Sequence, residues 1–373
     1  MKMRRLALAF YLFMILVLTG VAAEMKFPGA EWDEAAPESQ GVNSTKLEAA
    51  IRGLEQNAGG DGVKELVIAR NGVMIWRGDD IDKKHGVWSM TKSFTSTCLG
   101  LLIDDGKTSL DAYAKTYIPE MSETYPDLTL RHFAAMTSGY RAVGDTTEGS
   151  YKHGPSRTPF LPNPKPLFDP PGSAYAYWDS AMNQFAHVLT RIAGEPLERL
   201  FKRRIADPIG MDSTMWNWGD FGEINGLVVN GGSGNNSNHI FITARQGARF
   251  GHLFLNRGNW NGKQLISSEW IDAVHQVHVP NTVTNAFPDS GIDGPGMYGL
   301  NWWVNGVKPN GKHKWPDAPL ETYSASGYNN NDLFVIPEWK MVIVRLGLDQ
   351  RDNALSDSDY NAFLKGVGEA LME

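Results

Sequence analysis

The sequence is poor in cysteine, with one residue, Cys98, in a chain of 373. One cysteine excludes an intramolecular disulfide, so packing must hold the fold together. Cys98 lies within an apolar run, where we expect it to be a buried small hydrophobe. Positive charge is also scarce: 35 Lys and Arg stand against 42 Asp and Glu, a formal net charge of −7. Such a chain repels phosphate backbones, and we expect no nucleic-acid partner.

Long apolar runs are equally scarce. One extends from Leu6 to Leu18; basic residues precede it and small residues follow it up to Ala23. This order is typical of a secretory signal, so we exclude residues 1–23 from the fold and predict a periplasmic or secreted protein. A short anchoring helix is the alternative. The run is shorter than the ~20 residues that span a bilayer, so we expect no stable membrane span after cleavage.

Short patterns predict individual elements. Residues 44–57 contain helix formers with apolar residues at helical spacing, and Asn43 or Ser44 can cap this helix. Asn71-Gly72 joins two β-rich runs, which predicts a tight antiparallel hairpin.

The patterns divide the chain beyond the signal into two kinds of segment. Residues 24–105 and 219–373 alternate helical patterns with β-rich runs, including a predicted turn at 337–340. Residues 106–218 are mostly helical in pattern, with a Pro-rich stretch. We predict one α/β domain over residues 24–373, an antiparallel sheet flanked by helices, into which 106–218 is inserted as a mostly helical subdomain.

The stretch GVWSMTKSFTSTCLGLLIDDG places Ser89 three residues before Lys92 at the head of an apolar run. On a helix these side chains lie one turn apart and can meet. A serine hydroxyl is a poor nucleophile until a neighbour takes its proton, which a lysine can do where burial or nearby cations lower its pKa. One Ser-x-x-Lys match is expected by chance at this length, so the motif alone is weak evidence.

Two further stretches are candidates for the same site. PPGSAYAYWDSAMNQF places Tyr175 and Tyr177 shortly before Asp179 at a helix start. YSASGYNNNDLFVIP contains Gly327, and a glycine there would let a substrate approach a strand closely.

Together these motifs resemble the serine β-lactamase and penicillin-binding-protein superfamily in its class C branch, which includes carboxylesterases and 6-aminohexanoate-dimer hydrolases. The resemblance covers nearly the whole chain after the signal, because WSMTKSFTS, LRHFAAMTSGY, IADPIGMDSTMW, TARQGARFGHLFLNRG and LFVIPEWKMVIV follow in the expected order. It implies an exported serine hydrolase that forms an acyl-enzyme with a small or short-peptide-like amide or ester, without metal or organic cofactor.

The resemblance also assigns roles to residues. Ser89 matches the acylated nucleophile and Lys92 its helix partner. Tyr177 matches the tyrosine of the Tyr-x-Asn motif, which passes protons to the leaving group, and Tyr175 is the alternative. The oxyanion hole would consist of the backbone amides of Ser89 and Tyr328.

One position departs from the family pattern beside these residues. Asp179 stands where Asn is usual, and an ionised carboxylate can only accept hydrogen bonds. If Asp179 reaches Lys92, it holds the lysine charged and weakens it as a base. Tyr177 would then have to act as the base in its phenolate form.

A second departure concerns substrate recognition. Ala325-Ser326-Gly327 stands where penicillin-recognising members have Lys or His before x-Gly, so a substrate carboxylate loses a partner. This favours the esterase and amino-acid-oligomer hydrolase branches. We expect these three residues, Trp178 and Asp179 to contact substrate. The alternatives are a true β-lactamase or D-Ala-D-Ala carboxypeptidase, and a sensor or binding domain without turnover.

Two features receive structural interpretations. His275 and His278 could share a helix face, but further metal ligands are lacking nearby, and we predict no metal site. The glycine-rich stretch GGSGNN, residues 231–236, follows no clear strand and is interpreted as a flexible loop.

Overall fold

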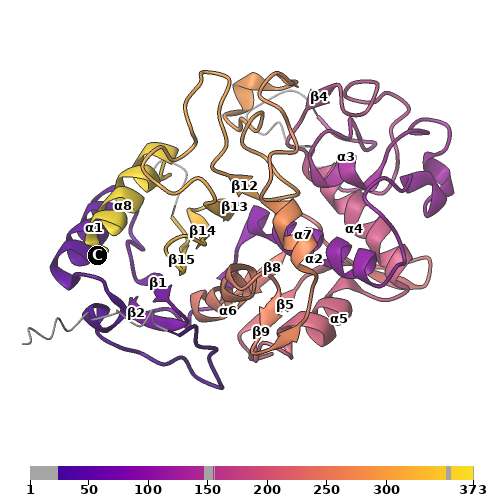
Figure 1. Ribbon diagram of the computed structural model, residues 1–373. Coiled ribbons are helices and arrows are strands. Elements are labelled where there is room, and N and C mark those ends of the chain that lie inside the picture. The colour runs from indigo at the N-terminus through magenta and orange to yellow at the C-terminus, as the bar shows by residue number, and fades with distance from the viewer. Residues whose placement is uncertain (1–23, 147–153, 155, 350–353, 373) are drawn as a thin grey trace, which may run out of the picture.

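The computed structural model describes residues 24–146, 154, 156–349 and 354–372 (Figure 1). The predicted signal, residues 1–23, lies outside these ranges. Within them, no helix combines the length and apolarity needed to cross a membrane.

A six-stranded antiparallel sheet joins the two ends of the chain (Figure 1). Its strands, in spatial order, are β12 (Trp303–Val304), β13 (Tyr323–Gly327), β14 (Asn331–Ile336), β15 (Met341–Leu346), β1 (Glu65–Arg70) and β2 (Val73–Arg77). The pairing of β1 with β15 sets Glu65 opposite Leu346, so early and late segments form one hydrogen-bonded unit. The predicted fold class is confirmed.

Local turn chemistry explains two of the strand connections. Asn71 and Gly72 have φ values of 53° and 76°, as a tight turn between β1 and β2 requires. Between β14 and β15, the Lys340 N–H donates to the Pro337 carbonyl at 2.9 Å, and Lys340 has a φ of 51°. Both predicted turns are present.

Helices cover both faces of the sheet (Figure 1). The helices are α1 (Ser44–Asn57), α8 (Asp357–Ala370), α6 (Ala244–Leu255) and α2 (Thr91–Asp104). On β1, Ile68 packs in the cluster under α1 and α8, whereas its neighbour Val67 packs in the cluster that contains α6 and α2. Alternate strand residues point to opposite faces, so both faces of the sheet are buried. Helix α1 coincides with the predicted 44–57, and Asn43 caps it.

The region between residues 106 and 218 contains α3 (Leu130–Ala134), β4 (Ala174–Tyr175), α4 (Asp179–Ala193), α5 (Leu197–Phe201), a π-helical turn (Lys202–Ala206) and short 3-10 turns. A three-stranded sheet, β3 (His85–Gly86), β8 (Ile240–Ile242) and β5 (Trp216–Trp218), connects this region to the rest of the chain. The remaining strands and α-helix are β6 (Asp220–Ile224), β7 (Leu227–Asn230), β9 (Asn259–Trp260), β10 (Lys263–Gln264), α7 (Ser268–Val274) and β11 (Thr284–Asn285).

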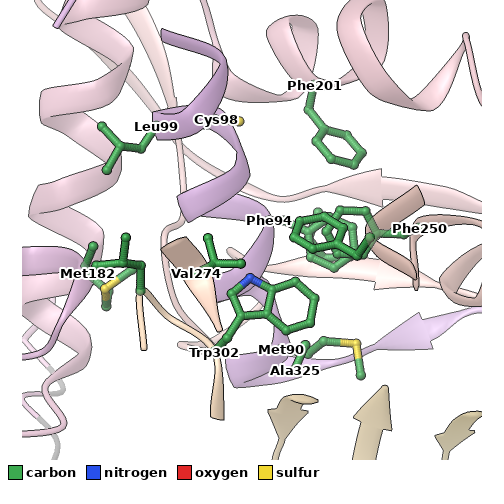
Figure 2. Close-up of a cluster of buried hydrophobic side chains, with 14 of the residues drawn as sticks. Met90, Phe94, Cys98, Leu99, Met182, Phe201, Phe250, Val274, Trp302 and Ala325 are labelled. Atoms are coloured by element: carbon green, nitrogen blue, oxygen red, sulfur yellow. The ribbon is translucent and has the colours of Figure 1, made fainter. Parts of the chain in front are cut away.

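Helix α2 runs through the centre of the largest core cluster (Figure 2). All of its residues from Thr91 to Leu102 are buried. Phe94 stacks on Phe250 of α6 with ring centroids 4.2 Å apart, and Cys98 is fully buried, as predicted. A helix buried on every side cannot shift without repacking the core, so it is a rigid support for the residues at its start.

Candidate active site

Ser89 lies in a 3-10 turn, Trp88–Met90, immediately before α2. Trp88 has a φ of 44°, in the left-handed region that bulky residues avoid. Such a conformation costs about 1–3 kcal/mol and concentrates at functional sites, where the surrounding structure enforces it. The turn that presents Ser89 is therefore held in place by its neighbours.

Two glycine backbones press against this turn from different parts of the chain. A Cβ added to Gly234 would lie 2.8 Å from the Ser89 nitrogen, which no side chain tolerates. A Cβ added to Gly327, at the end of β13, would overlap the Val87 carbonyl. Contact with the chain itself therefore explains the glycine at 327, and substrate contact there remains a prediction.

The Lys92 ammonium makes three hydrogen bonds. It donates to Ser89 Oγ at 2.8 Å, Asp179 Oδ1 at 2.7 Å and Ser233 Oγ at 2.6 Å. Lys92 is 1 % exposed and Ser233 is fully buried. All three N–H donors of the ammonium are engaged. Two acceptors, Asp179 and Ser233, hold the ammonium group so that its third N–H points toward Ser89 Oγ.

Asp179 is the first residue of α4, where the helix dipole favours a carboxylate. Ser233 also donates to Asp179, and the Asn235 amide donates to its second oxygen at 3.2 Å. One turn along α4, Asn183 donates to Asn235 at 2.8 Å and accepts from the Gly232 N–H at 3.1 Å. The carboxylate thus joins Lys92 to the segment that follows β7.

Residues 231–236 form a loop, as interpreted from the sequence, and this loop is anchored to α4. Hydrogen bonds from α4 hold this segment, and it delivers Ser233 to Lys92. Sequence reasoning missed Ser233 because its flanking glycines suggested mobility, whereas Gly234 allows the backbone to approach Ser89. The available signal was the polar triplet Ser-Gly-Asn, which follows a short β-rich run after two glycines.

Tyr177 meets both members of the Ser-x-x-Lys pair. Lys92 Nζ lies 4.3 Å from its ring centroid, and its side chain hydrogen-bonds that of Ser89. Burial, reinforced by the charge of Asp179, raises the pKa of Tyr177 far above its usual value, although the bond to Ser89 opposes the rise. The raised pKa disfavours the phenolate form that Tyr177 would need in order to act as the base.

Tyr175, the alternative to Tyr177, points elsewhere. It packs edge-to-face on Tyr298 at a centroid distance of 5.7 Å. Its buried hydroxyl has no hydrogen-bond partner in the part of the chain that the structure describes. Of the two tyrosines, the structure brings Tyr177 to Ser89.

Two predicted substrate contacts have buried side chains. Trp178 is 1 % exposed, donates from Nε1 to Asp145 at 2.8 Å and stacks on Phe287. Ala325 is also 1 % exposed and belongs to the core cluster around α2 (Figure 2). Ser326 lies on the opposite face of β13, its hydroxyl 3.0 Å from that of Ser324. The Trp178 and Ala325 side chains therefore belong to the core.

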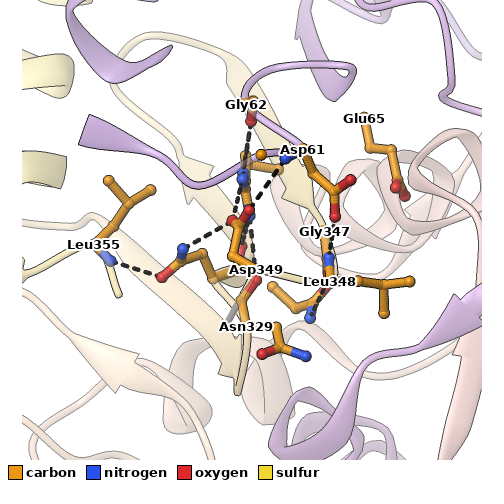
Figure 3. A network of polar contacts seen from close by, with 12 residues as sticks. Asp61, Gly62, Glu65, Asn329, Gly347, Leu348, Asp349 and Leu355 are labelled. Atoms are coloured by element: carbon orange, nitrogen blue, oxygen red, sulfur yellow. Dashed lines mark hydrogen bonds and ion pairs between the residues drawn. The ribbon is translucent and has the colours of Figure 1, made fainter. Parts of the chain in front are cut away.

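Tyr328 follows β13 and is 50 % exposed, with its ring edge-to-face against Trp88 at 5.9 Å. A polar network around Asn329 and Asp349 holds the turn that continues to β14 (Figure 3). Arg345 donates to the carbonyls of Asn329 and Asn330 at 3.1 and 3.2 Å, and it forms a buried ion pair with Asp349. This network fixes the backbone around Tyr328, whose amide is the predicted oxyanion donor.

The two histidines considered as metal ligands bond the backbone instead. His275 Nδ1 lies 2.7 Å from the Ile271 carbonyl, and His278 Nε2 lies 2.9 Å from the Ala273 carbonyl. Among the residues that the structure describes, no three His, Cys, Asp or Glu side chains gather as metal ligands would.

The chain that carries the Ser89–Lys92 pair also matches a known family. The model of the Beta-lactamase family matches residues 47–362. The chain belongs to this family. The superfamily predicted from the motifs is thereby confirmed.

The relatives reported below share only a small part of their sequence with this member of the Beta-lactamase family. The 6-aminohexanoate-dimer hydrolase of Paenarthrobacter ureafaciens is 21% identical over 315 residues, 78% of each chain. Among solved structures, a putative 6-aminohexanoate-dimer hydrolase from Bacillus anthracis has a TM-score of 0.56 at 23% identity, covering 82% of this chain and 77% of its own. A family VIII carboxylesterase has a TM-score of 0.63 at 16% identity, covering 89% and 99%. Both structural likenesses concern the fold.

Proposed function

We propose that this Beta-lactamase family protein is an exported serine hydrolase that cleaves an ester or amide through an acyl-enzyme on Ser89. The observation that carries the proposal is the buried Lys92 nitrogen, 2.8 Å from Ser89 Oγ. The direct test is incubation with a fluorophosphonate probe followed by intact mass measurement. A single adduct supports the proposal, and an unlabelled protein supports a binding domain without turnover.

Lys92 acts as the base in its deprotonated form. Its two remaining N–H groups stay bonded to Asp179 and Ser233, so its lone pair faces Ser89. The Ser89 proton moves to Lys92 as Oγ attacks the substrate carbonyl, and the oxygen of that carbonyl becomes an oxyanion. The amides of Ser89 and Tyr328 stabilise this charge.

Tyr177 carries the second proton transfer. As a phenol hydrogen-bonded to Ser89, it gives its proton to the leaving group and recovers one from Lys92, which lies over its ring. The departing alcohol or amine leaves an acyl-Ser89 ester. Water then attacks this ester and gives a proton to Lys92. The bond between the acyl carbon and Ser89 Oγ breaks, and Lys92 passes the proton to Oγ as the acid leaves, which restores the free enzyme.

We expect nitrocefin to be a poorer substrate than 4-nitrophenyl butyrate. Ala325 brings no charge to the position where penicillin-recognising relatives have a cation, and its methyl group is buried. Losing a charge-assisted hydrogen bond costs about 1.5–3 kcal/mol, roughly 10- to 150-fold in kcat/KM. The measurement is kcat/KM for both substrates; a higher value for nitrocefin would reject the argument.

Replacing Ser233 by alanine should lower kcat/KM for the ester about tenfold or more, because Lys92 loses one of the two acceptors that orient it. Ser233→Thr keeps the hydroxyl and should restore part of the rate. Ser237→Ala, at an exposed serine of the same segment, is the matched control. Equal rates for Ser233→Ala and Ser237→Ala would show that Ser233 does not orient the base.

A further inference from the structure

A cavity of about 690 Å³ opens beside Gly327 and Tyr328, at the end of β13. Its volume is within the range of small-molecule sites. The walls include Trp303, Lys308, Lys314 and the first residues of α8. None of these residues belongs to the predicted catalytic set, and the proposed reaction does not use them.

One aromatic ring connects this cavity to the candidate active site. Trp303 stacks on Tyr177, with ring centroids 6.0 Å apart and planes 20° apart. Lys314 Nζ lies 4.8 Å from the Trp303 centroid and 5.0 Å from that of Trp315. The indole of Trp303 therefore lies between the ring of Tyr177 and the Lys314 ammonium. Gly327, whose backbone packs against the turn that carries Ser89, lines the same cavity as Lys314, so the cavity begins next to the candidate active site.

The cavity wall carries two ammonium groups that share one carboxylate. Lys308 donates to Asp357 Oδ2 at 2.8 Å, and Lys314 donates to Oδ1 of the same residue. The Lys308 and Lys314 side chains are only 23% and 11% exposed. Asp357 begins α8, a helix of 14 residues whose N-terminal dipole adds positive potential.

Two other carboxyl groups face this region. Asp332 is buried, and burial raises its pKa, although hydrogen bonds from Ser326 and Tyr360 oppose the rise. Its ionised form is thus disfavoured relative to a carboxyl in water. Asp293 is exposed at the rim, where water screens its charge. Burial lowers the pKa of Lys314, although the charge of Asp357 and its hydrogen bond oppose the fall. Two lysines share the single carboxylate of Asp357, so the enclosed part of the wall is suited to a second anion.

We propose that this cavity binds a carboxylate at the leaving-group end of the substrate, with Lys314 and Lys308 as its cations. The inference rests on the proposed function, in which Tyr177 protonates the leaving group on the Trp303 side. It also specifies the substrate class: an ester or amide whose leaving group ends in a carboxylate. A cation at position 325 would lie close to the cleaved bond, whereas Lys314 suits a carboxylate that is several bonds away from the cleaved bond.

Two matched esters test the proposal: 4-(butyryloxy)phenylpropionic acid, whose leaving phenol carries a carboxylate, and its methyl ester, which lacks the charge. The measured quantity is the ratio of kcat/KM for the acid to that for the methyl ester, so the folded fraction of each variant cancels. We expect a wild-type ratio of about 10 to 150, the factor that a charge-assisted hydrogen bond provides. Lys314→Met, which keeps the length and apolar contacts of the side chain, should reduce the ratio at least tenfold.

Lys312→Met is the control, because Lys312 is exposed on the same loop and does not line the cavity. It should leave the ratio at its wild-type value. Equal hydrolysis of the two esters by the wild type, or an unchanged ratio in Lys314→Met, would overturn the carboxylate site alone. Failure of the wild type to hydrolyse either ester would instead contradict the proposed function.

Discussion

Replacing Ser89 by alanine should abolish ester hydrolysis and leave the fold intact. The hydroxyl provides the covalent step, and losing the nucleophile of a coupled site costs several orders of magnitude in kcat, about 10⁶ in a well-studied serine protease. The side chain is small, and α2 behind it is held by its own buried contacts. The measurements are kcat for 4-nitrophenyl butyrate, the fluorophosphonate adduct by intact mass, and the midpoint of thermal unfolding.

Ser96→Ala is the matched control for this variant. Ser96 lies on α2, is buried, and donates to the Ser93 carbonyl within the helix. It should keep both turnover and the adduct. If the purified Ser89→Ala protein kept a tenth of wild-type activity, or still formed the adduct, another residue would be the nucleophile.

Replacing Asp179 by asparagine should change both the pH profile and the stability. The wild-type carboxylate accepts a hydrogen bond from Lys92 at 2.7 Å. Asparagine keeps the size of the side chain but removes this negative charge from beside the reacting groups. We therefore expect the pH profile of kcat/KM for 4-nitrophenyl butyrate to differ between the variant and the wild type, measured over the same pH range.

The same variant leaves a buried ammonium without a counter-ion. Breaking a buried ion pair by removing one partner costs about 3–5 kcal/mol in the free energy of unfolding. The deficit relative to wild type should appear as a lower midpoint of urea unfolding at neutral pH. Coincident activity profiles and equal urea midpoints would show that the carboxylate does not tune Lys92.

Local elements could be predicted where a short stretch of sequence decides the conformation. The Asn71-Gly72 hairpin follows from two residues that tolerate positive φ, and α1 follows from its apolar spacing with Asn43 as cap. Helical spacing also predicted the meeting of Ser89 and Lys92. In each case the residues that cause the contact are close together in the sequence.

Contacts between distant segments could not be derived in this way. The bond between Ser233 and Lys92 joins residues 141 positions apart, and nothing local to the glycine-rich stretch indicates it. Trp178 lies next to Asp179 but is drawn into the core by Asp145 and Phe287. The sequence therefore predicted which residues gather near Ser89 more accurately than which side chains point toward it.

The turn that carries Ser89 packs between the main chain at Gly234 and the main chain at Gly327. Main-chain contacts of this kind depend on the absence of a side chain at two positions and little on the identity of the residues around them. Mutations of exposed side chains near the site, at Tyr328 for example, can therefore accumulate without displacing the nucleophile. This separation gives the scaffold high evolvability: selection can change the preferred substrate step by step while the two glycines preserve the reactive geometry.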